Sequence, residues 1–368
     1  MMYKIGGKFM KLKVGIIGCG GIANGKHLPS LHELDTVEIT AFCDIVEARA
    51  IQAKKQYGTK VAKVYTDYEE LLQDESLDVV HVCTPNKSHA VITVAALEAG
   101  KHVMCEKPMA KTTAEAKAMV SAAKRTGKKL TIGYQNRFRP DSQYLYEACQ
   151  NNELGEIYFA KAHAIRRRAV PTWGVFLNKE EQGGGPLIDI GTHALDLTLW
   201  LMDNYRPKYV VGNSYHQLSA QEQAANAFGS WDPQQFKVED SAFGFITMEN
   251  GATIMLESSW ALNTLEEGEA KTTLCGSIGG ADMKAGLRLN GEKYGRLYDQ
   301  TIHTDASGVA FYEGGADTAE MVEARQWIES IINDTEPLVK PEQALMVTRI
   351  LEAIYESAQT KKPVFFQN

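Results

Sequence analysis

The sequence predicts an α/β domain with a doubly wound parallel sheet, followed by an α+β domain with a large, mostly antiparallel sheet. Three observations support this prediction. The chain has 368 residues, which is too long for one ordinary hydrophobic core. Its first third alternates apolar strand-like runs with helical patterns, as in parallel sheets covered on both faces. After about residue 135 longer strand-like runs predominate, so we expect domains over residues 10–134 and 135–368.

The first domain is expected to contain five apolar strands with helices between them. The helices carry recognisable end signals: Ser88 before an apolar helical run that stops at Gly100, and pairs of Thr with Glu three residues later, at Thr66 and Thr112, that form capping boxes. The strand-like runs are KVGIIG (13–18), VEITAFCD (37–44), LDVVHVCTP (77–85), HVMCEKP (102–108) and KLTIGYQ (129–135).

The second domain begins with runs that suit long antiparallel strands. Two of them meet at Asn250-Gly251, the commonest two-residue hairpin turn. A broad antiparallel sheet must cover its apolar face, and oligomerisation is one way to do so. The strand-like runs are 156–168, 208–218, 241–250 and 251–263, and helical runs at 318–335 and 341–359 close the chain.

Composition excludes several classes of protein. The net charge is −7, from 39 basic and 46 acidic residues, and no long basic run is present, so nucleic acid is not expected as a partner. The six cysteines are scattered, and four lie in or beside strand-like runs, as buried thiols of a reducing compartment do. No membrane-spanning stretch or signal peptide is recognisable. We therefore expect a cytoplasmic protein without a membrane partner.

A glycine-rich turn after the first strand predicts the cofactor. Residues 18–23, GCGGIA, fit the G-x-G-x-x-A pattern, in which glycines let a pyrophosphate approach the backbone at a helix N-terminus. The alternative is an ordinary glycine turn. Asp44 ends the next strand, 21 residues after Ala23, where a carboxylate accepts hydrogen bonds from the adenosine ribose and repels a 2′-phosphate. NAD is therefore favoured over NADP, with contacts from Gly18, Gly20, Gly21, Ile22 and Asp44.

Four further residues are candidates for chemistry. Lys107 follows a buried strand at the edge where such sheets bind ligands, although a solvated loop lysine is the alternative. Asp189 and His193 are four residues apart, so an α-helix would place them on one face, and Asp196 follows three residues later. A helix-start aspartate and a core histidine are the alternatives. No cysteine or second histidine stands at ligand spacing, so no metal is expected.

The sequence resembles the Gfo/Idh/MocA family of oxidoreductases (glucose–fructose oxidoreductase and inositol dehydrogenase) over essentially its whole length. The resemblance rests on five motifs in the family's order: GIIGCGGIA (15–23), CTPNKSH (83–89), EKP (106–108), GYQNRFRP (133–140) and DIGTHALDL (189–197). It implies a Rossmann domain, an open-sheet domain, and NAD(P)-dependent oxidoreduction of sugars, cyclitols or related polyols by homodimers or homotetramers.

The resemblance also implies roles for individual residues. Lys107, Asp189 and His193 match the catalytic set and contact substrate as well. The positions that match the cofactor-lining residues of the family are Thr84, Pro85, Asn86, His89, Glu106 and Lys107. Gln135 and Arg137 match positions near the nicotinamide and substrate. Such a set suits hydride transfer from a ring hydroxyl, with His193 as the base and Lys107 stabilising the developing alkoxide. Asp189 orients His193 or binds a neighbouring hydroxyl.

Substrate identity is less constrained by the sequence. Trp173 is placed to stack on a sugar or cyclitol ring, whereas Arg166, Arg167 and Arg168 suit either an anionic group or a solvated strand face. We expect a neutral ring polyol: a sugar, glycoside or cyclitol. Two alternatives remain from the resemblance, an NAD-binding sugar sensor without turnover and an enzyme that retains NAD while cycling between sugar and ketosugar. The presence of Lys107 and His193 argues against the sensor.

Overall fold

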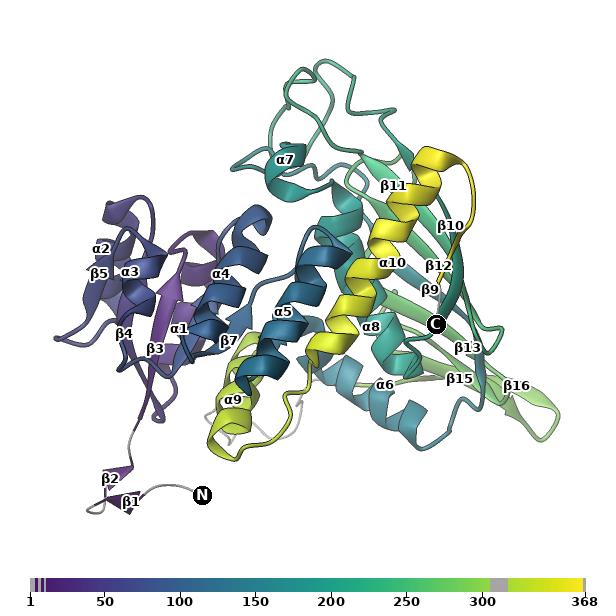
Figure 1. Cartoon of the computed structure of the whole chain (residues 1–368). Helices are drawn as coiled ribbons and strands as arrows, with labels where there is room; N and C mark the ends of the chain where they lie inside the picture. The colour runs from purple at the N-terminus through teal and green to yellow at the C-terminus, as the bar shows by residue number, and fades with distance from the viewer. Residues whose placement is uncertain (1–3, 6–7, 10, 305–316, 367–368) are drawn as a thin grey trace. The chain divides into compact units, whose positions relative to one another are not determined.

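The structure is a computed structural model that describes residues 4–5, 8–9, 11–304 and 317–366. Contacts between Cα atoms divide the chain into two compact units (Figure 1). Unit 1 consists of Met1–Gln135 and Asp317–Leu345, and unit 2 of Asn136–Ala316 and Met346–Asn368. This grouping differs from the domain boundaries expected above, which place residues 317–345 in the second domain.

Unit 1 contains a six-stranded sheet in which every neighbouring pair is parallel. The strand order β5-β4-β3-β6-β7-β8 is that of a doubly wound dinucleotide-binding sheet, with its switch point between β3 and β6. Ligands of such sheets bind at the carboxyl ends of the strands beside the switch point. The strands are β3 (Leu12–Ile17), β4 (Val37–Cys43), β5 (Lys63–Tyr65), β6 (Val79–Val82), β7 (His102–Cys105) and β8 (Leu130–Ile132).

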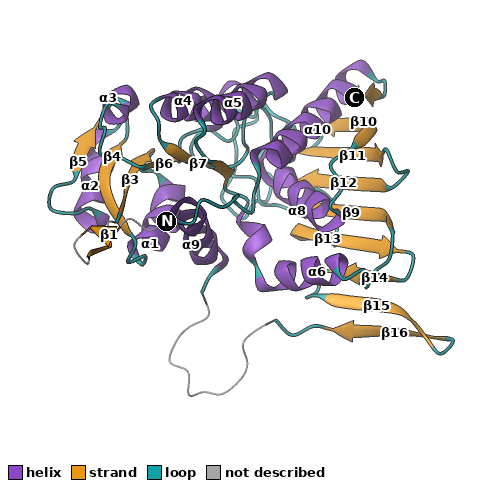
Figure 2. Ribbon diagram, turned by 60° about the horizontal axis from the view of Figure 1, so that its bottom comes forward, coloured by secondary structure: helices purple, strands orange, loops and turns teal. Residues whose placement is uncertain are grey.

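Helices cover both faces of this sheet, α4 and α5 on one and α1 and α9 on the other (Figure 2). The α9 helix comes from far along the chain, and its Trp327 and Ile328 join the core cluster that contains Leu28 and Leu31 of α1. The helical segments are η1 (Ala23–His27, π-helical), α1 (Leu28–His32), α2 (Glu47–Tyr57), α3 (Tyr68–Leu72), α4 (Asn86–Glu98), α5 (Thr113–Thr126) and α9 (Ala319–Ile332). A short antiparallel pair, β1 (Lys4–Ile5) and β2 (Lys8–Phe9), precedes the sheet.

One of the three expected helix starts is confirmed. Thr112 and Glu115 form a complete capping box at the start of α5. The expectation at Thr66 is wrong, because Asp67 is the N-cap of α3 and accepts the backbone N–H of Glu69. The expectation at Ser88 is also wrong: α4 already begins at Asn86, directly after a proline, whose fixed φ suits a residue that leads into a helix.

Unit 2 contains a nine-stranded sheet in the order β16-β15-β14-β13-β9-β12-β11-β10-β17. Only β12 and β9 pair in parallel, so the expected mostly antiparallel sheet is confirmed. The strands are β9 (Ile157–Ile165), β10 (Pro207–Tyr215), β11 (Ser241–Met248), β12 (Thr253–Ser259), β13 (Gly268–Gly276), β14 (Gly279–Asp282), β15 (Arg288–Lys293), β16 (Arg296–Thr301) and β17 (Val364–Phe365).

Helices pack on one face of this sheet (Figure 2). Side chains alternate along β10 and β11, so that Val210 and Ile246 are buried whereas Val211 and Phe245, which pair across the two strands, are 39% and 43% exposed. Among the described residues of unit 2, the second face of the sheet is therefore partly apolar and exposed. The helical segments are η2 (Gln135–Phe138, 3₁₀), α6 (Pro140–Gln150), α7 (Lys179–Gln182), η3 (Leu187–Gly191, π-helical), α8 (Thr192–Met202) and α10 (Pro341–Thr360), which begins in unit 1.

The expected hairpin between β11 and β12 is confirmed, but its turn has a different form. A two-residue Asn-Gly turn of type I′ needs positive φ at both residues. Here only Gly251 has positive φ, +88°, and Met248 N–H donates to Ala252 O at 2.8 Å. The loop is therefore the three-residue type, in which a type I turn is followed by a left-handed glycine.

All six cysteines are free thiols, and Cys19, Cys43, Cys83 and Cys105 are buried as expected for the strand-like runs. In the part of the chain that the structure describes, no helix is both long and apolar enough to cross a membrane.

Candidate functional site

The glycine-rich turn after β3 leaves room for a ligand. Gly18 has a φ of +92°, and a Cβ there would lie 2.6 Å from Cys83 O, so this position requires glycine. In contrast, a Cβ on Gly20 or Gly21 would meet no atom within 4 Å. The backbone at these two residues is thus open, and the helical segment that starts at Ala23 directs its N-terminal end to the same turn. This geometry suits a pyrophosphate.

Asp44 connects the end of β4 to this turn. Its two carboxylate oxygens accept the backbone N–H groups of Cys19 and Val46, at 2.9 and 2.8 Å. A carboxylate offers about four acceptor positions, so two remain for the hydroxyls of a ribose. The side chain of Asp44 therefore shapes the turn and also fits the adenosine-binding position of an NAD site.

The loop after β6 provides a second part of this edge. The hydroxyl oxygen of Thr84 is buried and has no hydrogen-bond partner among the described residues. Such an atom fits a site that a ligand completes, because buried polar groups are otherwise paired. His89 is buried, and its ring nitrogens lie 2.8 Å from Thr84 O and 2.7 Å from Pro108 O. His89 thus holds the loops after β6 and β7 together, while Pro85 and Asn86 form the start of α4.

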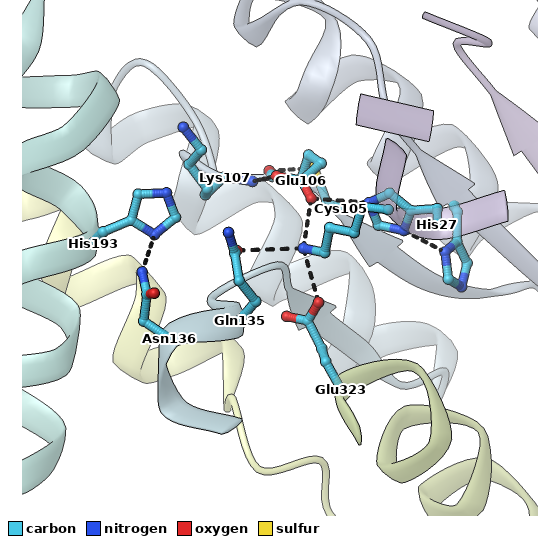
Figure 3. Close-up of polar contacts among 10 residues, drawn as sticks. His27, Cys105, Glu106, Lys107, Gln135, Asn136, His193 and Glu323 are labelled. Atoms are coloured by element: carbon cyan, nitrogen blue, oxygen red, sulfur yellow. Dashed lines mark hydrogen bonds and ion pairs between the residues drawn. The ribbon is translucent and has the colours of Figure 1, made fainter. Parts of the chain in front are cut away.

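Glu106, directly after β7, is the centre of a buried polar cluster (Figure 3). Its Oε1 accepts from Lys26 Nζ at 2.8 Å and from His27 Nε2 at 2.9 Å. Its Oε2 accepts the backbone N–H of Lys107 at 3.0 Å, which fixes the backbone of the half-buried candidate lysine. Gln135 is 3.4 Å from the same Lys26 ammonium. Glu106 therefore supports the loop that carries Lys107 at this edge of the sheet.

The cluster holds one lysine between two carboxylates. Lys26 Nζ also lies 2.8 Å from Glu323 Oε2 of α9. Burial by itself would raise the pKa of Glu106, but Lys26 and His27 outweigh this effect and hold that pKa well below its usual range. Burial raises the pKa of Glu323 to about 7, since Lys26 compensates it only in part. Glu323 is thus the carboxyl group of the cluster that takes up a proton near neutral pH.

Two buried histidines extend the cluster toward β6. The Nδ1 atoms of His27 and His81 are 2.9 Å apart, so one must donate and the other accept. Burial lowers the pKa of both rings, which are therefore neutral. Because His27 donates from Nε2 to Glu106, its Nδ1 accepts, and His81 must carry its proton on Nδ1.

Unit 2 contains the aspartate and histidine of the second candidate cluster. Asp189 lies in the π-helical turn η3, and its Oδ2 accepts the indole N–H of Trp260 at 3.1 Å. His193 lies in the first turn of α8, and Nδ2 of Asn136 is 3.1 Å from its Nδ1 (Figure 3). Each of the two residues contacts a side chain from another element, Trp260 for Asp189 and Asn136 for His193.

The loop that leads to Asp189 is fixed by a buried carboxylate. Glu239 accepts the backbone N–H groups of Gly185 at 2.9 Å and Leu187 at 3.2 Å, and the hydroxyl of Tyr355 at 2.7 Å. A Cβ on Gly184 would lie 2.0 Å from that hydroxyl, and one on Gly185 would lie 2.2 Å from Glu239 O. The glycines of this loop are therefore needed for close packing around Glu239.

Arg137 and Asp196 form a buried ion pair. Arg137 is fully buried, and its guanidinium donates to Asp196 at 2.6 and 2.9 Å and to Tyr205 at 3.3 Å. Asp196, on α8, is 1% exposed. The contact of Arg137 with substrate stays a prediction.

Two of the three arginines at 166–168 have side-chain contacts within unit 2, and Arg167 is exposed. Arg166 forms a two-point ion pair with Glu269 at 2.6 and 2.7 Å, and Arg168 donates to the carbonyls of Arg167 and Leu262. Trp173, in contrast, is 52% exposed and meets the rings of Phe176 and Phe228 nearly at right angles. These contacts are consistent with the expected neutral substrate, but Trp173 remains a predicted substrate contact.

Several residues of these clusters are not identified by sequence reasoning. They are Lys26, His27, His81, Glu323, Asn136, Glu239 and Trp260. Asn136 lies inside the motif GYQNRFRP, so its position carries a signal that could have identified it. Glu323 and Trp260 carry no local signal, because their partners are distant in the sequence.

Comparisons with known proteins agree with this geometry. Residues 12–134 match the model of the Gfo/Idh/MocA oxidoreductase family, NAD-binding Rossmann fold, and residues 147–366 match that family's C-terminal alpha/beta domain. The D-glucoside 3-dehydrogenase of Escherichia coli (strain K12) is 37% identical over 353 residues, which cover 95% of this chain and 96% of that protein.

Solved structures share the fold. The aldose-aldose oxidoreductase from Caulobacter crescentus complexed with glycerol has a TM-score of 0.78 and 25% identity, covering 97% of this chain and 100% of that one. A levoglucosan dehydrogenase in complex with NADH and levoglucosan has a TM-score of 0.81 and 21% identity, covering 97% and 99%. Together with the open glycine turn, the two family matches show that the chain belongs to the Gfo/Idh/MocA oxidoreductases, with unit 1 carrying their NAD-binding Rossmann domain.

Proposed function

We propose that the protein is an NAD-dependent dehydrogenase that oxidises a ring hydroxyl of a neutral sugar, glycoside or cyclitol. The observation that carries the proposal is the similarity, over 95% of the chain, to a D-glucoside 3-dehydrogenase. The pairing of Arg166 with Glu269 and of Arg137 with Asp196 supports a neutral substrate, since neither cation is left for an anion. A glycoside is the substrate class that this similarity favours.

We assign the cofactor-binding role to residues 10–134 and the substrate-binding role to residues 135–368. The fit of NAD rests on the open backbone at Gly20 and Gly21, the buried hydroxyl of Thr84 and the carboxylate of Asp44. When bound, NAD supplies the acceptor for the hydride that leaves the alcohol carbon.

The chain's own groups handle the proton and the charge. His193 takes the hydroxyl proton, because an imidazole titrates near neutral pH and can act as a general base. The ammonium of Lys107 stabilises the negative charge that develops on the hydroxyl oxygen. Asp189 binds a neighbouring hydroxyl or orients the base. The nitrogen of His193 that acts as base depends on which amide atom of Asn136 faces Nδ1. With the amide oxygen of Asn136 turned to Nδ1, the neutral ring carries its proton on Nδ1, and Nε2 is the base.

We also propose a cytoplasmic homo-oligomer. The partly apolar open face of β10 and β11 would be covered by a second copy of the chain, which gives a homodimer or, with a further interface, a homotetramer.

The test is an initial-rate screen with NAD over inositols, free sugars and glycosides, in which NADH formation is measured. His193→Ala and Lys107→Ala should each keep NAD affinity and lose turnover, with loss of a general base alone costing roughly 10²–10⁴-fold. Reduction of a bound cofactor by sugar without release of NADH would identify an enzyme that retains NAD. Tight NAD binding with no redox change across the panel would contradict the proposal and favour a sensor.

A further inference from the structure

We propose that Trp260 is a positioning residue that directs the carboxylate of Asp189, a role that rests on the proposed dehydrogenase function. The indole Nε1–H donates to Asp189 Oδ2 at 3.1 Å. Trp260 follows the end of β12, whereas Asp189 lies in η3, so the contact joins two elements that are distant in the sequence.

The side chain of Trp260 is fixed in one orientation by its surroundings. It is one of the largest fully buried side chains, with 0% of its surface exposed. Its backbone N–H donates to Asp240 O at 3.0 Å, and its ring packs against Phe176 and Phe236 at centroid distances of 6.4 Å. A ring enclosed in this way has one orientation, and its N–H therefore points in one direction.

The Asp189 carboxylate needs a contact that sets its orientation, because the backbone of Asp189 alone does not fix its side chain. The residue is half-buried, and its N–H donates to Gly185 O at 3.1 Å, within the glycine-rich loop held by Glu239. A carboxylate turns about two side-chain bonds, and a misplaced catalytic group loses rate steeply with small displacements. Arg166 lies within electrostatic reach of Asp189 and is itself paired with Glu269. The indole N–H of Trp260 adds a directional contact to the Asp189 carboxylate.

A matched pair of variants separates this role from general packing. Trp231 is also buried, packs against Phe236 at 5.9 Å, and donates its indole N–H to a backbone carbonyl, Ser219 O, at 3.1 Å. Trp260→Phe and Trp231→Phe each replace an indole by a smaller ring in one aromatic cluster. Only the first removes a donor from Asp189.

The first measurement is a double-mutant cycle in kcat/KM with the sugar that gives the highest native rate. Trp260→Phe should lower kcat/KM about tenfold, as expected for loss of a hydrogen bond to a charged group, and should leave NAD affinity unchanged. In an Asp189→Ala background, which has no side-chain acceptor, the same substitution should have almost no further effect, whereas Trp231→Phe should act equally in both backgrounds. A near-native kcat/KM for Trp260→Phe, or effects of Trp260→Phe and Asp189→Ala that multiply, would overturn the proposal.

The second measurement needs no turnover, so it separates this proposal from the proposed function. The chain has five tryptophans, and ¹⁵N-labelled indole groups give one NMR signal each. The Trp260 signal is assigned from its absence in Trp260→Phe and should move in Asp189→Ala, which removes the acceptor, while the Trp231 signal stays in place. An unchanged Trp260 signal overturns the positioning role. If the native protein oxidises no sugar but the Trp260 signal moves as expected, the proposed function is overturned while the contact between Trp260 and Asp189 stands.

Discussion

At the scale of single residues, the two candidate clusters depend on which groups donate and which accept. Asp44 accepts a hydrogen bond from the backbone N–H of Cys19 in the glycine-rich turn, and Asn136 contacts a ring nitrogen of His193. The proposed roles of both residues therefore depend on particular hydrogen bonds. A single substitution tests each of these bonds.

Replacement of Asp44 should change the choice between NAD and NADP. The carboxylate repels a 2′-phosphate, so native enzyme should strongly prefer NAD. Asp44→Asn keeps an acceptor oxygen beside Cys19 but removes the charge, and Asp44→Ala removes both. Initial rates with each cofactor should show a smaller preference in both variants, with a further loss of NAD-dependent kcat/KM in the alanine variant. Equal or better native turnover with NADP contradicts this assignment.

Asn136→Asp should move the pH dependence of turnover. An aspartate 3.1 Å from Nδ1 of His193 would accept a hydrogen bond from the protonated nitrogen and so stabilise the imidazolium. A base must be unprotonated to act, so the acidic limb of the pH–rate profile should move to higher pH. The control is Gln143→Glu, which makes the same change of charge at an amide that donates to Arg137 O instead of contacting His193. A shift of equal size in both variants would exclude a specific effect on His193.

At the scale of elements, both clusters are built on π-helical turns, η1 after the glycine-rich turn and η3 around Asp189. Such turns are rare and are concentrated at functional sites. The α9 helix contributes in a different way, since it brings the buried carboxyl of Glu323 to Lys26. Because this carboxyl is buried, its contribution to the free energy of unfolding should depend on pH.

Burial raises the pKa of Glu323 from 4.5 to about 7. Between these values the unfolded chain loses a proton that the folded protein keeps, so this group's contribution to stability falls as pH rises through that window. The melting temperature of Glu323→Gln relative to native protein should therefore increase between about pH 5 and pH 8. Each kcal/mol by which the native free energy of unfolding falls corresponds to roughly 2–4 °C. Glu329→Gln, on the exposed side of the same helix, is the control. A constant difference across this range would show that Lys26 fully compensates Glu323.

At the scale of the whole molecule, the open face of the large sheet is the feature that bears on assembly. Phe245→Lys places a charge at its apolar part, opposite Val211, and should reduce the mass measured by light scattering to that of a monomer. Tyr294→Lys introduces the same charge at a residue that is 91% exposed between β15 and β16, and should leave the mass unchanged. An oligomer that survives Phe245→Lys must use another surface.

The sequence predicts the fold class because its signals are local. Alternating apolar strands and helices define the parallel sheet, and Gly18 lies where the turn requires a glycine. Helix starts are less predictable, because Asp67 and Thr66 offer similar caps and only the backbone decides between them. The contacts of Glu323 and Trp260 join distant segments, so no periodicity reveals them. The ion pair of Arg137 with Asp196 is not predicted from the sequence for a related reason: tertiary packing alone brings the two residues together.

The return of residues 317–345 to unit 1 imposes an order on biosynthesis. The glycine-rich turn and Asp44 leave the ribosome early, but the helix that covers Leu28 and Leu31 is translated only after strands β9 to β16 of unit 2. Until then the nascent chain lacks Trp327, Ile328 and the Glu323 partner of Lys26. Unit 1 therefore begins first and is completed after most of unit 2 has been made, so a chain that stops before α9 would have an uncovered apolar face.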